Sequence, residues 1–315
     1  MGSTRPEHLN KLYDEYAKRR SSFAHQLAGI FRARSQLDAW TNASVLDVGC
    51  GGGQMCEEFA ALGADVTGIE YSVGRITAMA GRNLNFRLIG GDGHYLPFEA
   101  RSFDYAIVAD VLEHAVDPRR MMQEVARVVR PGGLVYVGAT NRASVANLLF
   151  DPHYIAPLIP MMPKPIATWY VTKLLRLSGT FNVEKYFFRG ELLKCLHDAG
   201  FLCEPLPLYQ EKIRRDDFAV APGRNFVRRL LAFPGVRPLA LALAGTAAFG
   251  YLIAPGHVFL CQRDATGGVK GKGTLVCSVC HGPLRNGTQE LVCCKCGRTF
   301  GVKEGIPLMH PPVGA

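Results

Sequence analysis

Nine consecutive residues, Val45-Leu-Asp-Val-Gly-Cys-Gly-Gly-Gly53, limit most strongly what this chain can fold into. Their apolar start predicts a buried strand, and the glycines Gly49, Gly51 and Gly53 predict a loop that turns sharply and opens a helix. Because these positions have no Cβ atom, the backbone can approach a ligand closely. A glycine loop after a strand is shared by several nucleotide-binding folds and does not by itself identify the cofactor.

The residues around this loop alternate between short apolar runs and amphipathic stretches. Strands are expected at 44–48, 65–70, 85–89, 103–109 and 134–139, and helices at 54–62, 73–81 and 119–130. This alternation predicts an α/β fold, Rossmann-like, with a mostly parallel sheet and helices on both faces. Pro131-Gly132-Gly133 is expected to end a helix and turn the chain into the next strand.

Composition divides the chain into three parts. An N-terminal segment with apolar residues at helical spacing precedes the α/β domain, and a Gly- and Lys-rich linker leads to a small C-terminal module. The expected bounds are 1–43 for the helical segment, 44–264 for the α/β domain, 264–273 for the linker and 274–315 for the module.

Three acidic residues lie where the expected strands can bring them to a cofactor. Asp47 is in the strand before the loop, where a buried carboxylate is costly without a partner such as an ammonium group. Glu70 ends the next strand, about twenty residues further on, where an acid can accept hydrogen bonds from both ribose hydroxyls. Asp92, in Gly90-Gly-Asp-Gly93, follows the third strand and is placed to accept one from an adenine amino group.

Together these motifs resemble those of class I S-adenosylmethionine (SAM)-dependent methyltransferases, and within them the ubiquinone-biosynthesis O-methyltransferase group. The resemblance covers roughly residues 44–203, and a NAD-binding enzyme is the alternative. Its motifs are Leu46–Gly53, Val66–Glu70, Asp110–His114 with Asp117-Pro118, and Val129–Arg142.

The resemblance implies which residues bind SAM. The three loop glycines hold the methionine part, Glu70 holds the ribose, and Asp92 with Gly93 contacts the adenine. Tyr71 is expected to pack beside the adenine, with a plain core aromatic residue as the alternative.

Asp110-Val-Leu-Glu-His114 places two carboxylates and an imidazole after the fourth strand, where ligands bind in open α/β sheets. His114 can be the base that takes the proton of an attacking hydroxyl. Alternatively, Asp110, Glu113 and His114 can hold a divalent cation such as Mg²⁺ that acidifies the hydroxyl. The resemblance implies such metal dependence, although this chain has Asp at 110 where that group has Glu. In a third interpretation Glu113 and His114 only cap the next helix and shape the floor of the cofactor site.

Two lid-like inserts, 141–187 and 206–254, interrupt the alternation and are apolar, basic and punctuated by proline. An amphipathic run at 166–177 is expected in the first insert. Aromatic and basic residues on one apolar helix suit a membrane surface, a lid over an apolar substrate, or a buried core helix. The first two interpretations predict a hydrophobic acceptor that is quinone-, lipid- or polyketide-like. The residues concerned are Trp169, Tyr170, Lys173 and Arg176.

The C-terminal module carries two Cys-x-x-Cys pairs, Cys277 with Cys280 and Cys293 with Cys296, separated by twelve residues. Four thiolates at this spacing predict a closed tetrahedral zinc site of the ribbon type. A module of about forty residues has too small a hydrophobic core to be stable without a metal ion or a similar cross-link. The zinc is therefore expected to be structural.

This module also resembles the small zinc-binding activator subunit shared by several tRNA, rRNA and protein methyltransferases. The matching residues are Leu275–Leu284, Leu291–Gly297 and Gly305–Met309. In that family the module stabilises a catalytic partner by pairing with its sheet. The resemblance implies the same pairing here, within one chain or between two chains of a homodimer, with an inert appendage as the alternative.

The sequence therefore predicts a SAM-dependent methyltransferase that methylates oxygen on a hydrophobic small molecule. An acceptor in tRNA, rRNA or a translation factor is the alternative, favoured by the module and the net charge of +9. Nucleic acid is the less favoured partner, because the chain has no Asn-Pro-Pro-Tyr-type tetrapeptide and its arginines are interleaved with apolar residues. A non-catalytic scaffold is the third interpretation.

The expected location is cytoplasmic, peripheral to the membrane if the first insert binds one. No run of ~20 apolar residues that could span a bilayer is present, and no apolar segment of a secretory signal follows the first charges. Reduced thiols are expected at Cys50, Cys56, Cys195, Cys203 and Cys261.

Overall fold

The computed structural model describes residues 7–35, 39–206, 254–264 and 273–311, together with isolated residues between 207 and 272. The described residues form two compact units. One takes its residues from 1–108, 120–135 and 262–315, and the other from 109–119 and 136–261. Most of the second predicted insert, 206–254, and of the predicted linker lies outside the described residues.

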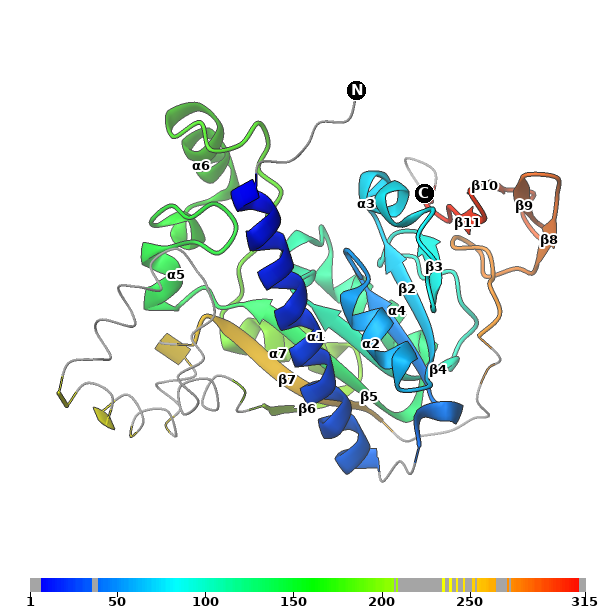
Figure 1. Ribbon diagram of the computed structural model, residues 1–315, viewed down its shortest axis with the longest axis horizontal. Coiled ribbons are helices and arrows are strands. Elements are labelled where there is room, and N and C mark those ends of the chain that lie inside the picture. Colours follow the sequence, from blue (N-terminus) through cyan, green and yellow to red (C-terminus); the bar gives the residue numbers. More distant parts are fainter. Residues whose placement is uncertain are drawn as a thin grey trace. The chain divides into compact units, whose positions relative to one another are not determined.

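Seven strands form one sheet in the order β3-β2-β1-β4-β5-β7-β6 (Figure 1). Strand β1 pairs in parallel with β2 and β4, and β2 pairs in parallel with β3. The register sets Val48 opposite both Ile69 and Val108, so that β1, β2 and β4 end close together. The predicted α/β sheet is confirmed. The strands are β1 Ser44–Val48, β2 Asp65–Glu70, β3 Arg87–Gly90, β4 Phe103–Ala109, β5 Val129–Thr140, β6 Phe201–Pro205 and β7 Gly256–Arg263.

The helices follow local signals in the sequence. Helix α3 begins after Ser72, whose hydroxyl accepts a hydrogen bond from the Arg75 amide. Helix α4 begins at Pro118, and the preceding Asp117 accepts one from the Arg119 amide. The helices are α1 Glu7–Ser35, η1 Trp40–Asn42, α2 Gln54–Ala61, α3 Val73–Met79, η2 Leu112–His114, α4 Pro118–Val128, α5 Val145–Leu149, η3 Ile159–Met161, α6 Lys164–Trp169, the π-helix η4 Tyr170–Leu174, and α7 Arg189–Asp198.

The turn predicted at Pro131-Gly132-Gly133 is wrong. Helix α4 ends at Val128 and β5 begins at Val129, so the three residues lie inside the strand. Within the strand Gly132 has φ 74°, a left-handed conformation that glycine adopts readily.

An aromatic cluster in the first unit joins α1 to α2 and β4. The Phe31 ring lies 5.0 Å from that of Tyr105 and 6.2 Å from that of Phe59, and Trp40 meets Phe59 edge-on at 5.2 Å. All four rings are buried. Burial of each such side chain stabilises the fold by about 1.5–3 kcal/mol, which fixes α1 against this part of the sheet.

The C-terminal module is a small antiparallel sheet in the order β11-β10-β9-β8. Within the first unit it meets the outer strand β3, where Leu308 forms a parallel bridge with Gly90 and the Met309 amide donates to the Gly90 carbonyl at 2.6 Å. Figure 1 shows β11 beside β3. This contact within the chain is a single bridge, and the four-stranded sheet of the module stays separate from the seven-stranded sheet. Its strands are β8 Leu284–Asn286, β9 Glu290–Cys293, β10 Thr299–Lys303 and β11 Ile306–Pro307.

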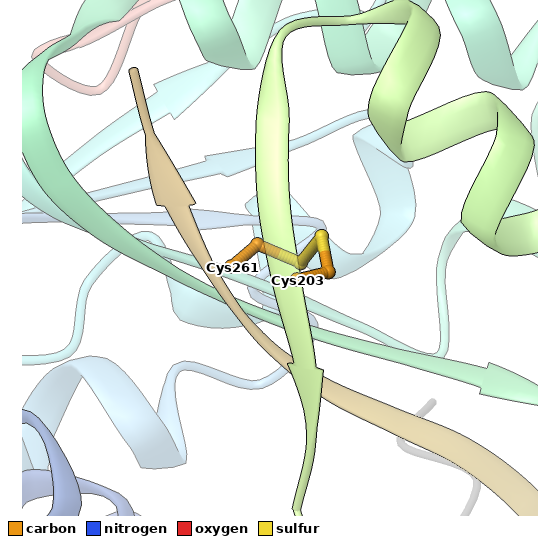
Figure 2. The surroundings of a disulfide bond; sticks show 2 residues. All are labelled: Cys203 and Cys261. Atoms are coloured by element: carbon orange, nitrogen blue, oxygen red, sulfur yellow. A yellow bond between two sulfur atoms is a disulfide. The ribbon is translucent and has the colours of Figure 1, made fainter. Parts of the chain in front are cut away.

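Cys203 and Cys261 form a disulfide bond between the neighbouring strands β6 and β7 (Figure 2). The expectation that both are reduced thiols is wrong, because the two residues face each other across the strands although 58 positions separate them. Cys50, Cys56 and Cys195 are free thiols, as predicted, and all three are buried.

Within the described part of the chain, no helix has both the length and the apolar character needed to cross a membrane.

Candidate functional site

The glycine loop connects β1 to α2 through left-handed backbone conformations. Gly49, Gly51 and Gly53 have φ values of 74°, 62° and 82°. A Cβ atom on Gly53 would lie 2.7 Å from the Phe86 ring, so that this position excludes a side chain for two independent reasons. The loop therefore has the sharply turning backbone, free of side chains at these positions, that the sequence predicts.

The Glu70 carboxylate lies at the end of β2 and is buried. Its Oε2 accepts a hydrogen bond from the Gly51 amide at 2.9 Å, and its Oε1 accepts one from the Ser72 amide at 2.8 Å. The Arg75 guanidinium lies 3.6 Å from Oε2. These contacts hold the carboxylate beside the glycine loop, where it can accept from ribose hydroxyls.

Asp47 is buried within β1, and burial raises the pKa of its carboxyl to about 6. The positive charge of Arg20 and the Cys56 thiol, whose sulfur lies 3.5 Å from Oδ2, oppose this rise. A ligand ammonium group beside the carboxylate would favour its ionised form. The site thus fits the amino group of the methionine part of SAM.

Asp92 lies two residues beyond β3 and is held by His94. Its Oδ1 accepts from the His94 amide at 2.9 Å and contacts the ring Nδ1 at 2.5 Å. Burial acts to raise the pKa of Asp92, but the contacts with His94 outweigh it and lower the pKa. At Gly93 a Cβ atom would lie 2.9 Å from Met121 Cε, so this segment also leaves no room for a side chain.

Tyr71 follows Glu70 and is 66% exposed, so the interpretation as a plain core aromatic residue is wrong. Its ring packs edge-to-face against the His310 ring, with centroids 5.4 Å apart. Its carbonyl accepts a hydrogen bond of 2.9 Å from His310 Nε2. An exposed aromatic ring directly after Glu70 is available to a flat ligand group.

Asp110, Glu113 and His114 belong to the second unit and follow β4. Asp110 has φ 55°, and its amide donates to the Gly138 carbonyl at 3.0 Å. Glu113 is fully buried, and burial together with the charge of Asp110 raises the pKa of its carboxyl to about 7. The carboxyl accepts a hydrogen bond from the Thr140 hydroxyl.

The His114 ring is oriented by a main-chain carbonyl. Its Nδ1 lies 2.8 Å from the Asn182 oxygen, and because a carbonyl only accepts, Nδ1 carries the proton. In the neutral ring Nε2 is then the unprotonated nitrogen and can take a proton. The part of the third interpretation in which Glu113 and His114 cap the next helix is wrong, since Asp117 caps α4.

The four module cysteines converge. Their sulfur atoms all lie within 4.8 Å of one another, with Cys277 3.7 Å from Cys296 and Cys280 3.5 Å from Cys293. A tetrahedral zinc site with Zn–S bonds of about 2.3 Å has its sulfur atoms about 3.8 Å apart. The cluster is therefore compatible with a zinc ion.

Two family models match the chain, one described as a methyltransferase domain over residues 46–137 and one as a Trm112p-like protein over 274–305. The ubiquinone biosynthesis O-methyltransferase of Thiobacillus denitrificans is 32% identical over 168 residues, which cover 51% of this chain and 66% of that protein. The protein of the same name from Coxiella burnetii is 32% identical over 162 residues, which cover 47% and 69%. The chain belongs to the class I SAM-dependent methyltransferases.

The matches to these two relatives span 66% and 69% of their lengths. Among solved structures, a complex of the Trm112 methyltransferase activator with a methyltransferase from Haloferax volcanii is similar at 17% identity. That match covers 83% of this chain and 100% of the other, with a TM-score of 0.46.

In this methyltransferase, sequence reasoning missed a cluster that surrounds His114. The His153 ring meets the His114 ring edge-on at 5.1 Å, and its Nε2 lies 3.8 Å from Glu113 Oε1. Its Nδ1 lies 3.9 Å from Oδ2 of the buried Asp151, which also accepts from the Tyr186 hydroxyl. Burial acts to lower the pKa of His153, but the contact with Asp151 and the Glu113 charge outweigh it and raise the pKa.

The structure does not bring Asp110, Glu113 and His114 together as a ligand set. Among the residues that the structure describes, the four cysteines are the only group of three or more potential ligand side chains whose ligand atoms converge. The predicted Mg²⁺ site of the methyltransferase is therefore not supported.

Proposed function

We propose that this methyltransferase transfers the methyl group of SAM to a hydroxyl oxygen of a hydrophobic small molecule that is quinone-, lipid- or polyketide-like. The observation that carries the proposal is the orientation of His114, whose Nδ1 donates to the Asn182 carbonyl and leaves Nε2 as a proton acceptor. Two relatives at 32% identity are named ubiquinone biosynthesis O-methyltransferases, which supports oxygen as the methylated atom.

The first unit supplies the residues for cofactor binding. The glycine loop accommodates the methionine part, Asp47 pairs with its ammonium group, and Glu70 accepts from the ribose hydroxyls. Asp92 and Gly93 meet the adenine, beside Tyr71. When bound, SAM supplies a methyl group on a positively charged sulfur, which is open to attack by an oxygen nucleophile.

The second unit supplies the proton acceptor. As the acceptor oxygen forms its bond to the methyl carbon, the carbon–sulfur bond breaks with its electrons going to sulfur. The hydroxyl proton passes to His114 Nε2. The His153 ring packs edge-on against the His114 ring at 5.1 Å, and its nitrogens lie 3.8 Å from Glu113 and 3.9 Å from Asp151.

The first insert supports a hydrophobic acceptor. One side of α6 and η4 is buried, with Ala167 and Val171 in a cluster that includes Ile159 and Tyr186. The other side is apolar but exposed, and Trp169 is 55% exposed. The helix is thus half-buried, and the exposed side fits a membrane surface from which an apolar acceptor is taken. The other exposed apolar residues of the insert include Leu158, Ile166, Leu174 and Leu177.

Flotation with anionic vesicles tests this surface role. Wild-type protein is expected to float with the vesicles, and Trp169→Ala to float less. Leu202→Ala is the control, because Leu202 is an exposed apolar residue of β6 outside the insert. A wild-type protein that stays unbound would remove membrane contact from the proposal while leaving the reaction intact.

The module is proposed to hold one structural zinc ion through Cys277, Cys280, Cys293 and Cys296. Four protein ligands complete the tetrahedron, so the ion has no open position for a substrate.

Isothermal titration with SAM and with S-adenosylhomocysteine tests the cofactor site. Micromolar binding by the wild type, lost in Glu70→Ala and weakened in Asp47→Ala, is expected. Hydrophobic phenols, acids and lipids are then screened as acceptors, with and without magnesium. A wild type that binds neither ligand at millimolar concentration would overturn the proposal.

A further inference from the structure

We propose that His310, from the end of the C-terminal module, is part of the SAM site, where it forms with Tyr71 an aromatic wall against the adenine base. This inference rests on the proposed cofactor site and adds a residue that neither the methyltransferase match, 46–137, nor the module match, 274–305, includes.

The approach of the module to β3 begins with a glycine. A Cβ atom on Gly90 would lie 2.6 Å from Leu308 Cδ2 and 2.9 Å from Ile76 Cδ1. Because Gly90 has no side chain, Leu308 can form its bridge there and the Met309 amide can donate to the Gly90 carbonyl. Met309 is fully buried, which anchors the segment immediately before His310.

From this anchor, the His310 ring lies between the residues that follow β2 and the end of β3. Its Nε2 donates to the Tyr71 carbonyl at 2.9 Å, and its Cε1 is 3.4 Å from the position of a Cβ atom on Gly90. The ring also packs edge-to-face against Tyr71. One hydrogen bond and one ring contact therefore fix the imidazole at the ends of two neighbouring strands.

The same strand ends carry the proposed adenosine ligands. Glu70, the ribose acid, is bonded to Tyr71 in the chain, and Asp92 lies two residues beyond Gly90. An adenine that reaches from Glu70 to Asp92 must pass the ends of β2 and β3, where Tyr71 and His310 lie. Aromatic rings contact a flat base favourably, face-on or edge-on. With Nε2 protonated, the neutral ring also offers Nδ1 as a hydrogen-bond acceptor.

The test is isothermal titration of the full-length, zinc-loaded chain with S-adenosylhomocysteine and with 5′-methylthioadenosine, which keeps the adenosine but lacks the amino-acid part. His310→Ala is expected to weaken binding of both ligands by the same factor, about three- to tenfold. The variant loses one ring contact with the adenine and the contact that orders the Tyr71 ring. Arg285→Ala, on an exposed position of β8, is the matched control in the module and is expected to bind both ligands as the wild type does.

Tyr71→Ala tests the same wall without a change in the module, and its exposed position makes it harmless to folding. This variant is also expected to bind both ligands more weakly. The double variant should lose less than the product of the two single losses, because either change already opens the wall.

Two results would overturn the inference. One is unchanged binding of both ligands by His310→Ala. The other is a loss for S-adenosylhomocysteine alone, which would put the contact at the amino-acid end. A wild type that binds neither ligand would instead overturn the cofactor site itself, so the two failures are distinguishable.

Discussion

The Thr140 hydroxyl donates a hydrogen bond of 2.7 Å to Oε1 of Glu113, while Oε2 of the same carboxyl has no hydrogen-bond partner among the residues described. A fully buried carboxylate with an unsatisfied oxygen is costly when ionised. Burial and the Asp110 charge accordingly raise the pKa of Glu113 to about 7, from its usual value of 4.5. Near neutral pH the side chain thus changes between a neutral and a charged form.

This relationship predicts how stability depends on pH. Between pH 4.5 and about 7 the folded chain keeps the Glu113 proton and the unfolded chain has lost it, so the free energy of unfolding falls as pH rises. Glu113→Gln cannot ionise, and its stability relative to wild type should increase from pH 5 to pH 8 by up to about 3 kcal/mol. Urea unfolding at the two pH values measures this difference.

Glu290→Gln, on an exposed position of β9, is the control and should leave the pH dependence unchanged. An equal pH slope for Glu113→Gln and wild type would contradict the account of Glu113.

Cofactor affinity should depend on pH through Asp47. Burial raises the pKa of this carboxyl to about 6, and a ligand ammonium group favours the ionised form. Binding of SAM below pH 6 therefore releases a proton from Asp47. The affinity for SAM should rise from pH 5 to pH 7. The rise is at most about tenfold per pH unit, because no more than about one proton is released. Titration at several pH values measures the slope. Asp47→Asn should bind more weakly and without this slope.

A ligand control separates Asp47 from other titrating groups. 5′-Methylthioadenosine has no ammonium group, so its affinity for the wild type should stay flat over the same range. A slope of equal size for both ligands would assign the effect to another residue.

Gly53→Ala should destabilise the chain by about 1–3 kcal/mol, because the new methyl group meets the Phe86 ring and the left-handed backbone is strained. Gly81→Ala is the matched control, since Gly81 has the same φ of 82° but no atom within 4 Å of the new Cβ. Urea unfolding of both variants separates the strain, which they share, from the steric contact. Equal destabilisation of the two variants would show that the Phe86 ring moves aside without lowering the free energy of unfolding.

Removal of zinc should lower the melting temperature. A structural ion binds the folded module and not the unfolded one, so its binding energy is folding energy. A strong chelator or Cys296→Ser should lower the melting temperature by several degrees, and metal analysis should find about one zinc per chain before treatment. Cys294→Ser, an exposed neighbour outside the cluster, should change neither. The proposed zinc site would be contradicted if the purified protein contained no zinc. It would also be contradicted if Cys294→Ser lowered the melting temperature as much as Cys296→Ser does.

Features determined by neighbouring residues could be predicted from the sequence. Strands β1, β2 and β4 have the predicted bounds, because each is a short apolar run between turn residues. The conformation of the loop could be predicted equally well, because left-handed backbone at closely spaced glycines is a local property. The glycines are Gly49, Gly51 and Gly53.

Features that depend on distant contacts were missed. His153 acquires its role only when the insert folds over Glu113, 40 positions earlier, and no periodic pattern marks it. The disulfide between Cys203 and Cys261 depends on the alignment of β6 with β7 across a long insert. The contact between Tyr71 and His310 joins residues 239 positions apart, and His310 lies just outside the Gly305–Met309 motif.

The module is joined covalently to the domain that it contacts at β3, so the contact needs less affinity than one between separate proteins. Ten residues separate Arg263, at the end of β7, from Thr274, where the module begins. A short connection within one chain gives a local concentration in the millimolar range. A separate activator must find its enzyme at cellular concentrations, whereas here the chain itself holds the module beside its contacts at Pro97, Glu99 and Gly90. Every catalytic domain is thereby made with its own module, at a fixed ratio of one to one.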